Sequence, residues 1–264
     1  MSKHSALPIA LTIAGSDSGG GAGVQADLKT FAALGVHGVC AITCLTAQNP
    51  RVVRGIEAAR PAFVRAQLDA VFEELAPSAA KTGLLCSAET IRVVAKFFRQ
   101  RNRPPLVVDP VMVATSGRRL LDAAAVEALR HELLPLAVLV TPNLPEAEIL
   151  TGHRIDSIEA LRSAAREIHG LFGCAALVKG GHLRGVREAV DFFHDGRTEL
   201  MLSAPFVRGV KTHGTGCTYS AAITAHLSRG CWLAEAVSCA KQFVTSAIAG
   251  SRRVRGHQVL GWFA

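Results

Sequence analysis

The sequence predicts an α/β fold, a three-layer α/β/α sandwich around a mainly parallel central sheet. Short apolar runs alternate with longer helical patterns along nearly the whole chain. The runs expected to be strands, such as Leu106–Val108, are continuously apolar, as is typical of strands covered on both faces. No linker rich in Pro, Gly and Ser divides the 264 residues, so we expect a single domain spanning 1–264.

The same patterns place the individual elements. Strands are expected at Ile9–Ala14, Gly38–Thr43, Ala79–Lys81, Leu106–Asp109, Ala137–Val140, Ala175–Lys179, Ala189–Phe193 and Leu200–Ser203. Helices are expected at Gly23–Leu34, Pro61–Leu75, Ala88–Arg101, Ala123–Leu134, Leu144–Leu150, Ser157–Leu171, Gly216–Leu227 and Leu233–Ala249. Asp195-Gly196 separates the last two strands, which predicts a hairpin.

The charge balance favours an anionic ligand. The net charge is +8, and the Lys and Arg residues are scattered apart from one dense run at Arg252, Arg253 and Arg255. With one Tyr and two Trp, the chain lacks the aromatic side chains of a stacking platform for single-stranded nucleic acid. We therefore expect a nucleotide and no nucleic acid as partner.

The cysteines and the apolar runs bear on location. The seven cysteines form no C-x-x-C pair, which is typical of reduced thiols in a cytoplasmic protein. No apolar run reaches the roughly 18–20 residues of a membrane span, so no membrane partner is expected. Residues Ala6–Ala14 run directly into a Gly-rich turn and a helix, and we interpret them as a first strand rather than a signal peptide.

Two loops near the start of the chain are candidates for ligand binding, because ligands of parallel sheets bind at the carboxyl ends of the strands. The Gly-rich segment 14–23 matches neither a P-loop nor G-x-G-x-x-G, and a purely structural turn explains it equally well. Asp27, on the helix that follows, faces either the site or solvent. Gln48 offers both a donor and an acceptor for the edge of a heteroaromatic ring, although a loop cap also fits this fragment.

Two further loops carry oxygen ligands. Asp109 ends a buried strand, where a carboxylate needs a partner or a cation. Asn143 and Glu146 stand three residues apart at the start of a helix and face the same way. Such oxygens suit Mg²⁺, whereas Asn143 and Glu146 by themselves also make an ordinary capping box.

The last two loops suit a phosphate. Lys179 ends a strand before two glycines, which lets its ammonium reach a phosphate in an exposed turn. The turn Gly214-Thr215-Gly216-Cys217 enters a helix, whose first N–H groups make an anion hole. The helix dipole lowers the pKa of a thiol held there, so we expect Cys217 to be partly thiolate; a small buried cysteine is the alternative.

Taken together, the motifs point to a known family. They are AGSDSGGGAGVQADLKT (14–30), LTAQN (45–49), KTGLL (81–85), VVDPVMVATSG (107–117), TPNLPEAEIL (141–150), VKGGH (178–182) and THGTGCT (212–218). In this order the chain closely resembles the hydroxymethylpyrimidine/phosphomethylpyrimidine kinases of thiamine biosynthesis, within the ribokinase-like superfamily. The resemblance covers about residues 8–250.

The resemblance implies a ribokinase-like sandwich without the lid domain of the sugar kinases. It also implies a homodimer, the use of ATP and Mg²⁺, and two successive phosphorylations of 4-amino-5-hydroxymethyl-2-methylpyrimidine, first to its monophosphate and then to its diphosphate. The substrate pocket would be formed by Gln48, Gly15, Asp27, Leu84 and Val111. Metal and phosphates would be held by Asp109, Asn143 and Glu146, with Lys179 neutralising the transferred charge. The anion hole would consist of Gly214, Thr215, Gly216 and Cys217.

Two departures from the family pattern affect these expectations. Leu84 stands in the pocket where the family often has Met, and Thr115 stands where a Lys is usual. Losing that cation weakens the expectation of an efficient second phosphorylation. Many relatives in the superfamily carry an Asp at the position of Cys217.

Three other functions compete with this interpretation. A pyridoxine/pyridoxal kinase of the same superfamily is the nearest, because its substrate is also a hydroxymethylated heteroaromatic ring. A non-catalytic sensor of the pyrimidine is disfavoured because every proposed catalytic position is retained. Nucleic-acid binding through Arg252, Arg253 and Arg255 would show a strong dependence on salt.

Overall fold

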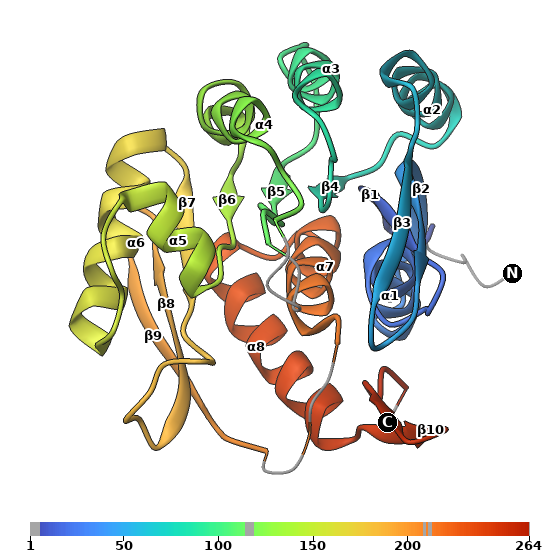
Figure 1. Ribbon diagram of the computed structural model, residues 1–264. Helices are drawn as coiled ribbons and strands as arrows, with labels where there is room; N and C mark the ends of the chain where they lie inside the picture. Colours follow the sequence, from blue (N-terminus) through green and yellow to red (C-terminus); the bar gives the residue numbers. More distant parts are fainter. Residues whose placement is uncertain (1–5, 114–118, 208–209, 211–212, 264) are drawn as a thin grey trace, which may run out of the picture.

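The structure is a computed structural model that describes residues 6–113, 119–207, 210 and 213–263. Its centre is a nine-stranded sheet with the order β3-β2-β1-β4-β5-β6-β7-β8-β9 (Figure 1). These strands are β1 (Ile9–Asp17), β2 (His37–Gln48), β3 (Val53–Ala58), β4 (Ala79–Thr82), β5 (Leu106–Val108), β6 (Leu139–Val140), β7 (Ala175–Lys179), β8 (Glu188–His194) and β9 (Glu199–Pro205). A separate hairpin joins β10 (Arg252–Val254) to β11 (His257–Val259).

The sheet is parallel in its middle and antiparallel at both edges. Strands β2, β1, β4, β5, β6 and β7 run parallel to one another, whereas β3 runs antiparallel to β2. Strands β8 and β9 form an antiparallel hairpin against β7. The predicted hairpin at Asp195-Gly196 is therefore confirmed. The carboxyl ends of the six parallel strands lie side by side at one end of the sheet.

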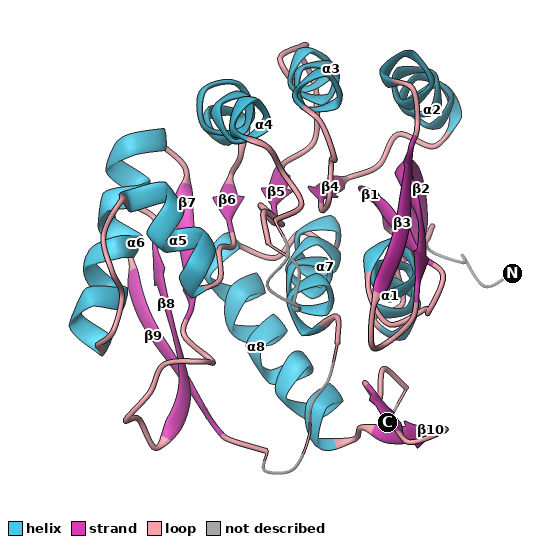
Figure 2. Cartoon of the chain, in the orientation of Figure 1, coloured by secondary structure: helices cyan, strands magenta, loops and turns pink. Residues whose placement is uncertain are grey.

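Helices cover both faces of the sheet (Figure 2). The main helices are α1 (Gly23–Ala33), α2 (Pro61–Glu74), α3 (Ala88–Phe98), α4 (Ala123–Ala128), α5 (Leu144–Thr151), α6 (Ile158–Phe172), α7 (Thr215–Ser228) and α8 (Leu233–Ala249). Helices α2 to α6 pack on one face, and α1, α7 and α8 pack on the other. The predicted three-layer sandwich is confirmed.

Alternate residues of the central strands explain the two cores. Leu106 and Val108 on β5 point into the core beneath α2 to α6, while Val107 between them packs with α7 and α8. Both cores are apolar, so each strand has to be apolar at every position. On the face of α1 and α8, the C-terminal segment adds Trp262, whose indole N–H donates to Thr218 Oγ1 at 3.1 Å.

Several elements differ from the sequence prediction. Strand β3 was missed, although Val53–Ala58 pairs with β2 as an edge strand. Strand β2 runs on to Gln48, so this side chain leaves a strand end and not a loop. The predicted helix over 123–134 is α-helical only to Ala128 and then continues as a π turn and a 3-10 turn, because Pro135 cannot extend it.

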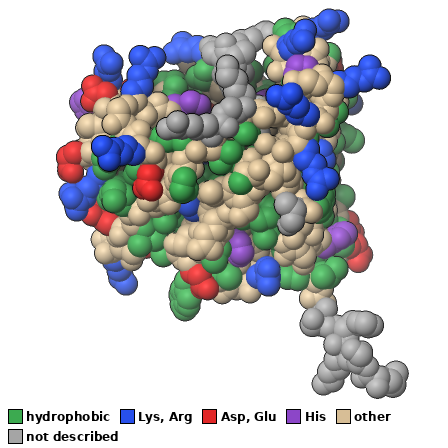
Figure 3. All heavy atoms as spheres, turned by 90° about the horizontal axis from the view of Figure 1, so that it is seen from below, with side chains coloured by type: hydrophobic (Ala, Val, Ile, Leu, Met, Phe, Trp, Pro, Cys, Tyr) green, Lys and Arg blue, Asp and Glu red, His purple; other side chains and the backbone are tan. Residues whose placement is uncertain are grey.

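A further difference concerns the basic run at Arg252, Arg253 and Arg255, which was not predicted to form strands. Arg252 and Arg253 lie on the small hairpin β10–β11, whose turn at Arg255 and Gly256 has positive φ at both residues. Seen from below, the Lys and Arg side chains lie mostly around the rim of the molecule (Figure 3). Within the described residues, no helix is both long enough and apolar enough to cross a membrane.

Candidate active site

A cavity of about 700 Å³ lies at the carboxyl ends of the parallel strands. Every residue that the sequence predicted for the site borders it: Gly15, Asp27, Gln48, Leu84, Asp109, Val111, Asn143, Glu146, Lys179, Gly214, Thr215, Gly216 and Cys217. These residues come from eight separate segments of the chain. The topology of a parallel sheet therefore explains why they meet.

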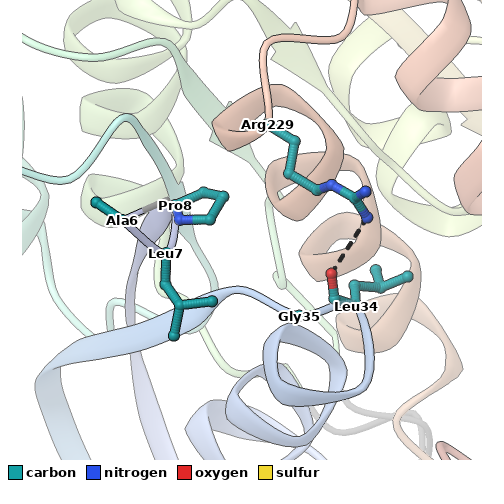
Figure 4. Close-up of a pocket in the computed structure, with 6 residues that line it drawn as sticks. All are labelled: Ala6, Leu7, Pro8, Leu34, Gly35 and Arg229. Atoms are coloured by element: carbon teal, nitrogen blue, oxygen red, sulfur yellow. Dashed lines mark hydrogen bonds between the residues drawn. The ribbon is translucent and has the colours of Figure 1, made fainter. Parts of the chain in front are cut away.

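A second hollow lies at the amino-terminal ends of β1 and β2, which Pro8 and Gly35 precede (Figure 4). The six residues lining it include one charged side chain, Arg229, whose Nη1 donates to the carbonyl oxygen of Leu34 at 3.3 Å. Because the Arg229 guanidinium bonds to the backbone, this hollow has few polar groups that could bind a ligand or take part in a reaction. The candidate site is the larger cavity.

An ion pair between Asp109 and Lys179 lies at the end of that cavity nearest the start of α7. Lys179 Nζ lies 3.0 Å from Asp109 Oδ1, and Asp109 is 3% exposed. Thr141 and Ser220 also donate to the Asp109 carboxylate, at 3.2 and 3.3 Å. Burial alone would raise the pKa of Asp109, but the Lys179 ammonium holds it below its usual value.

The predicted anion hole has the expected form. Helix α7 begins at Thr215 after Gly214, which has a φ of 82°. The turn is pressed against the Gly-rich loop after β1, because a Cβ on Gly214 would lie 1.8 Å from the carbonyl oxygen of Gly21. Lys179 Nζ lies beside this turn, 3.2 Å from where a Cβ on Gly216 would be. The first N–H groups of α7 and the Lys179 ammonium therefore converge on one place.

The ionisation predicted for Cys217 is wrong in this structure. Burial raises the pKa of the Cys217 thiol to about 12, and the nearby Asp27 and Asp109 carboxylates add to that effect. The Lys81 ammonium and a hydrogen bond from the Gly23 N–H oppose it without reversing it. The dipole of α7 was expected to favour a thiolate, whereas burial of the thiol favours its neutral form.

Asn143 and Glu146 form the capping box that the sequence allowed. Asn143 Oδ1 accepts from the N–H of Glu146 at 3.0 Å, and Glu146 Oε2 accepts from the N–H of Asn143 at 3.0 Å. Glu146 Oε1 also accepts from the N–H of Met112 at 3.2 Å. Burial raises the pKa of Glu146 to about 7, despite the neighbouring Lys179. The cap thus places a carboxylate of unusually high pKa beside Asp109.

These residues fit a magnesium ion that is shared with a nucleotide. No group of three or more His, Cys, Asp and Glu side chains suited to hold a metal occurs among the described residues. Mg²⁺ at such sites is normally bound through one or two carboxylates together with water and substrate phosphates. Asp109 and Glu146 supply two buried carboxylates, and a cation beside Glu146 would lower its raised pKa.

A histidine that was not predicted from the sequence, His213, contacts Gln48 at the other end of the cavity. Gln48 Nε2 lies 2.9 Å from His213 Nε2, and Asp17 Oδ2 lies 3.5 Å from the same nitrogen. Asp17 also accepts from backbone N–H groups of the Gly-rich loop, including those of Gly19 and Ala22 at 2.8 Å. His213 stands inside the motif THGTGCT, so its place beside the anion hole was the available signal.

Asp27 is at the floor of the cavity and is fully buried. Its two carboxylate oxygens accept from Lys81 Nζ at 2.7 Å and from Thr12 Oγ1 at 2.6 Å. Burial would lower the pKa of Lys81, but the Asp27 carboxylate raises it. The sequence allowed Asp27 to face either the site or solvent. In the structure Asp27 borders the cavity, but its oxygens bond to Lys81 and Thr12. A substrate contact by Asp27 stays a prediction.

Leu84 and Val111 line the cavity between its two ends. Both are partly exposed, which is the state expected of apolar side chains that face a ligand. Thr115, on which the expectation for the second phosphorylation depends, lies outside the described residues.

Comparison with known proteins identifies the family. The family model described as phosphomethylpyrimidine kinase matches residues 17–260. The chain belongs to the phosphomethylpyrimidine kinase family. This confirms the family, the enzyme class and the ribokinase-like fold that the sequence predicted.

Individual relatives agree with this assignment. The hydroxymethylpyrimidine/phosphomethylpyrimidine kinase of Rhizobium meliloti is 52% identical over 247 residues, which cover 93% of this chain and 92% of that protein. The thiamine biosynthesis bifunctional protein ThiED of Geobacter sulfurreducens is 50% identical over 248 residues. That match covers 94% of this chain but 50% of the Geobacter protein, so the chain spans half the length of that relative.

A solved structure links the fold to nucleotide binding. The pyridoxal kinase of Staphylococcus aureus, in complex with AMP-PCP and pyridoxal, superimposes with a TM-score of 0.88 at 35% sequence identity. The match covers 98% of this chain and 95% of that chain. A protein of the same fold therefore binds an ATP analogue together with a heteroaromatic alcohol, which supports the predicted use of ATP by this member of the phosphomethylpyrimidine kinase family.

Proposed function

We propose that the chain transfers a phosphoryl group from ATP to the hydroxymethyl group of 4-amino-5-hydroxymethyl-2-methylpyrimidine, and then a second one to the resulting monophosphate. The observation that carries this proposal is a single cavity with two unlike ends. One end has the neutral hydrogen-bonding side chain of Gln48, and the other has Asp109, Lys179 and the start of α7. A neutral ring and a polyphosphate need these two environments.

In this mechanism Gln48 reads the edge of the ring while His213 fixes the orientation of its amide. Lys179 and the first N–H groups of α7 stabilise the charge on the phosphoryl group in transfer. Asp109 and Glu146 would hold Mg²⁺, which would neutralise part of the charge on the phosphates. Asn143 keeps the Glu146 carboxylate in place through the capping box.

Cys217 serves as a neutral thiol in this proposal. Its raised pKa of about 12 favours orienting the acceptor oxygen over removing its proton. Phosphoryl transfer depends mainly on position and charge, so a strong base is not required. A neutral thiol also suits both steps, since the acceptor is a hydroxyl in the first and a phosphate oxygen in the second.

Product analysis tests the two steps. The protein is incubated with ATP, Mg²⁺ and the pyrimidine alcohol, and the products are followed by ³¹P NMR. We expect the monophosphate to appear first and the diphosphate later. Accumulation of monophosphate alone would contradict the second step, and folded protein that releases no ADP would indicate a sensor.

Pyridoxal is the competing acceptor. The higher identity to the Rhizobium meliloti kinase, 52% against 35% for the Staphylococcus aureus pyridoxal kinase, favours the pyrimidine. Comparing kcat/KM for the two alcohols decides between them. A clear preference for pyridoxal would overturn the proposed substrate.

The role of the thiol has its own test. Cys217→Ala is expected to keep the fold and substrate binding and to lose turnover by about 10²-fold. Cys174→Ala is the control, because Cys174 is buried in the core and does not itself border the cavity. Because a thiol with a pKa of about 12 stays protonated at ordinary pH, we also expect slow alkylation of Cys217 by iodoacetamide up to pH 9. Rapid alkylation at pH 7 would show a thiolate.

A further inference from the structure

A third buried ion pair stands next to the Lys179 loop, at the border of the same cavity, and the mechanism above gives it no role. Asp191 on β8 and Lys241 on α8 are 3% and 7% exposed, and Lys241 Nζ lies 2.7 Å from Asp191 Oδ2. Lys241 Nζ also donates to the carbonyl oxygen of Ala189 at 3.0 Å. Removing two charges from water costs several kcal/mol per ion, so a pair retained here needs a further reason.

The other oxygen of Asp191 reaches the Lys179 loop. Asp191 Oδ1 accepts from the N–H of Gly180 at 3.0 Å, and Asp191 lies opposite Lys179 in the register of β7 and β8. Gly180 is clamped at this point, since a Cβ there would lie 2.3 Å from the carbonyl oxygen of Val190. The backbone directly after Lys179 is therefore held by a carboxylate that Lys241 in turn holds in place.

The direction of the Lys179 side chain depends on that backbone. Lys179 Nζ has to stay 3.0 Å from Asp109 Oδ1 and beside Gly216 at the start of α7. On its other side, the N–H of Lys179 donates to the carbonyl oxygen of Pro142 at 2.9 Å. The strand end is thus fixed at the lysine by Pro142, which follows β6, and after the lysine by Asp191.

We propose that Asp191 and Lys241 are a positioning pair: they hold the Lys179–Gly180 turn so that the Lys179 ammonium stays between Asp109 and the first turn of α7. The proposal rests on the proposed function, in which Lys179 stabilises the transferred phosphoryl group. Misplacing such a group by about 1 Å can lower the rate about 10²-fold, and we expect a loss of at least about tenfold in kcat without the pair.

The first variant replaces the pair by apolar side chains of similar size, Asp191→Leu with Lys241→Met. Such a replacement often leaves stability unchanged or improves it, so it separates positioning from folding. We expect kcat to fall while KM for the pyrimidine alcohol stays the same, because Gln48 and His213 are untouched. The control is Arg162→Met, which removes a partly buried ion pair with Glu199 (2.7 Å) whose two residues do not border the cavity.

A double-mutant cycle shows whether the pair acts through Lys179. In a Lys179→Met background, replacing the pair is expected to cause no further loss of kcat. The affinity for AMP-PCP is also measured for the four proteins of the cycle, because this measurement requires no turnover. An equal loss in both backgrounds would show that the pair contacts the nucleotide directly, since both residues also border the cavity, and it would overturn the proposal.

Other outcomes are equally decisive. Unchanged kcat in the apolar variant would overturn the proposal, as would a loss of kcat that the Arg162→Met control matches at the same change in melting temperature. If the apolar variant does not fold, Asp191→Asn, which keeps the shape of the side chain, goes through the same cycle. Failure of the wild-type protein to phosphorylate the pyrimidine contradicts the proposed function instead, and the affinity cycle still reports on the pair.

Discussion

The two ends of the cavity are built in different ways. At the phosphate end, Asp109 is buried and Lys179 is partly buried, and the two charged groups are held by each other and by further partners. At the ring end, Gln48 is partly exposed and is held through one histidine. Groups that stabilise developing charge have to be fixed in advance, whereas groups that recognise a ring contribute mainly binding energy. Damage to the phosphate end should therefore lower kcat, and damage to the ring end should raise KM.

The largest effect is expected from Gly214→Ala. Alanine is strained at a φ of 82°, and its Cβ would lie 1.8 Å from the carbonyl oxygen of Gly21, so the start of α7 has to move. We expect kcat/KM to fall by about 10²-fold or more. The matched control is Gly230→Ala, which has a φ of 84° but no atom within 4 Å of the new Cβ. It should cost about 1 kcal/mol of stability and leave turnover intact; equal activity in the two variants would show that the turn tolerates displacement.

The next effect concerns pH and tests the charged end directly. Because the pKa of Glu146 is raised to about 7 in the folded protein, its contribution to stability is fully present below about pH 4.5 and is lost as the pH rises through 7. In buffer without divalent cations, the wild-type protein should lose up to about 3 kcal/mol over this range relative to Glu146→Gln. Denaturant unfolding of both proteins between pH 4.5 and 8 measures the difference. Parallel pH profiles would contradict a raised pKa.

The smallest effect is expected at the ring end, from Gln48→Ala. Losing one hydrogen bond to the ring costs about 1–1.5 kcal/mol, which corresponds to a rise in KM of about tenfold with little change in kcat. Gln67→Ala is the control, because Gln67 also bonds to β2, through the N–H of Ile42, but does not border the cavity. Steady-state kinetics separates the two parameters. A fall in kcat for Gln48→Ala would erase the contrast between the two ends.

The sequence predicted the position of the site better than its internal contacts. Asp109 and Lys179 were found because each stands where an apolar run ends, and Glu146 because it stands in the first turn of the helix after such a run; the carboxyl ends of parallel strands meet. The pairing of Gln48 with His213 joins residues 165 positions apart, and no local pattern encodes such a contact. The raised pKa of Cys217 was missed for a related reason, since a helix start is visible in the sequence and the burial around the sulfur is not.

The edges of the sheet were predicted less well than its centre. Strand β3 is short, half exposed and antiparallel, so it lacks the continuous apolar run that identifies the central strands. The alternation over Val53–Ala58 and the Asn49-Pro50 turn before it were the available signals. The hairpin β10–β11 was hidden because its arginines drew attention as a charge cluster, although Arg255-Gly256 is a hairpin turn.

The contact between Gly214 and Gly21 restricts how this protein can change over evolutionary time. The atom that excludes a side chain at residue 214 is a main-chain oxygen, so no substitution at residue 21 can remove it. A mutation at Cys217 or Leu84 leaves the frame of the site in place and can lead to a new acceptor or a different rate. A mutation at Gly214 displaces the frame itself. We therefore expect Gly214 to tolerate no substitution, whereas its neighbours can be replaced one at a time.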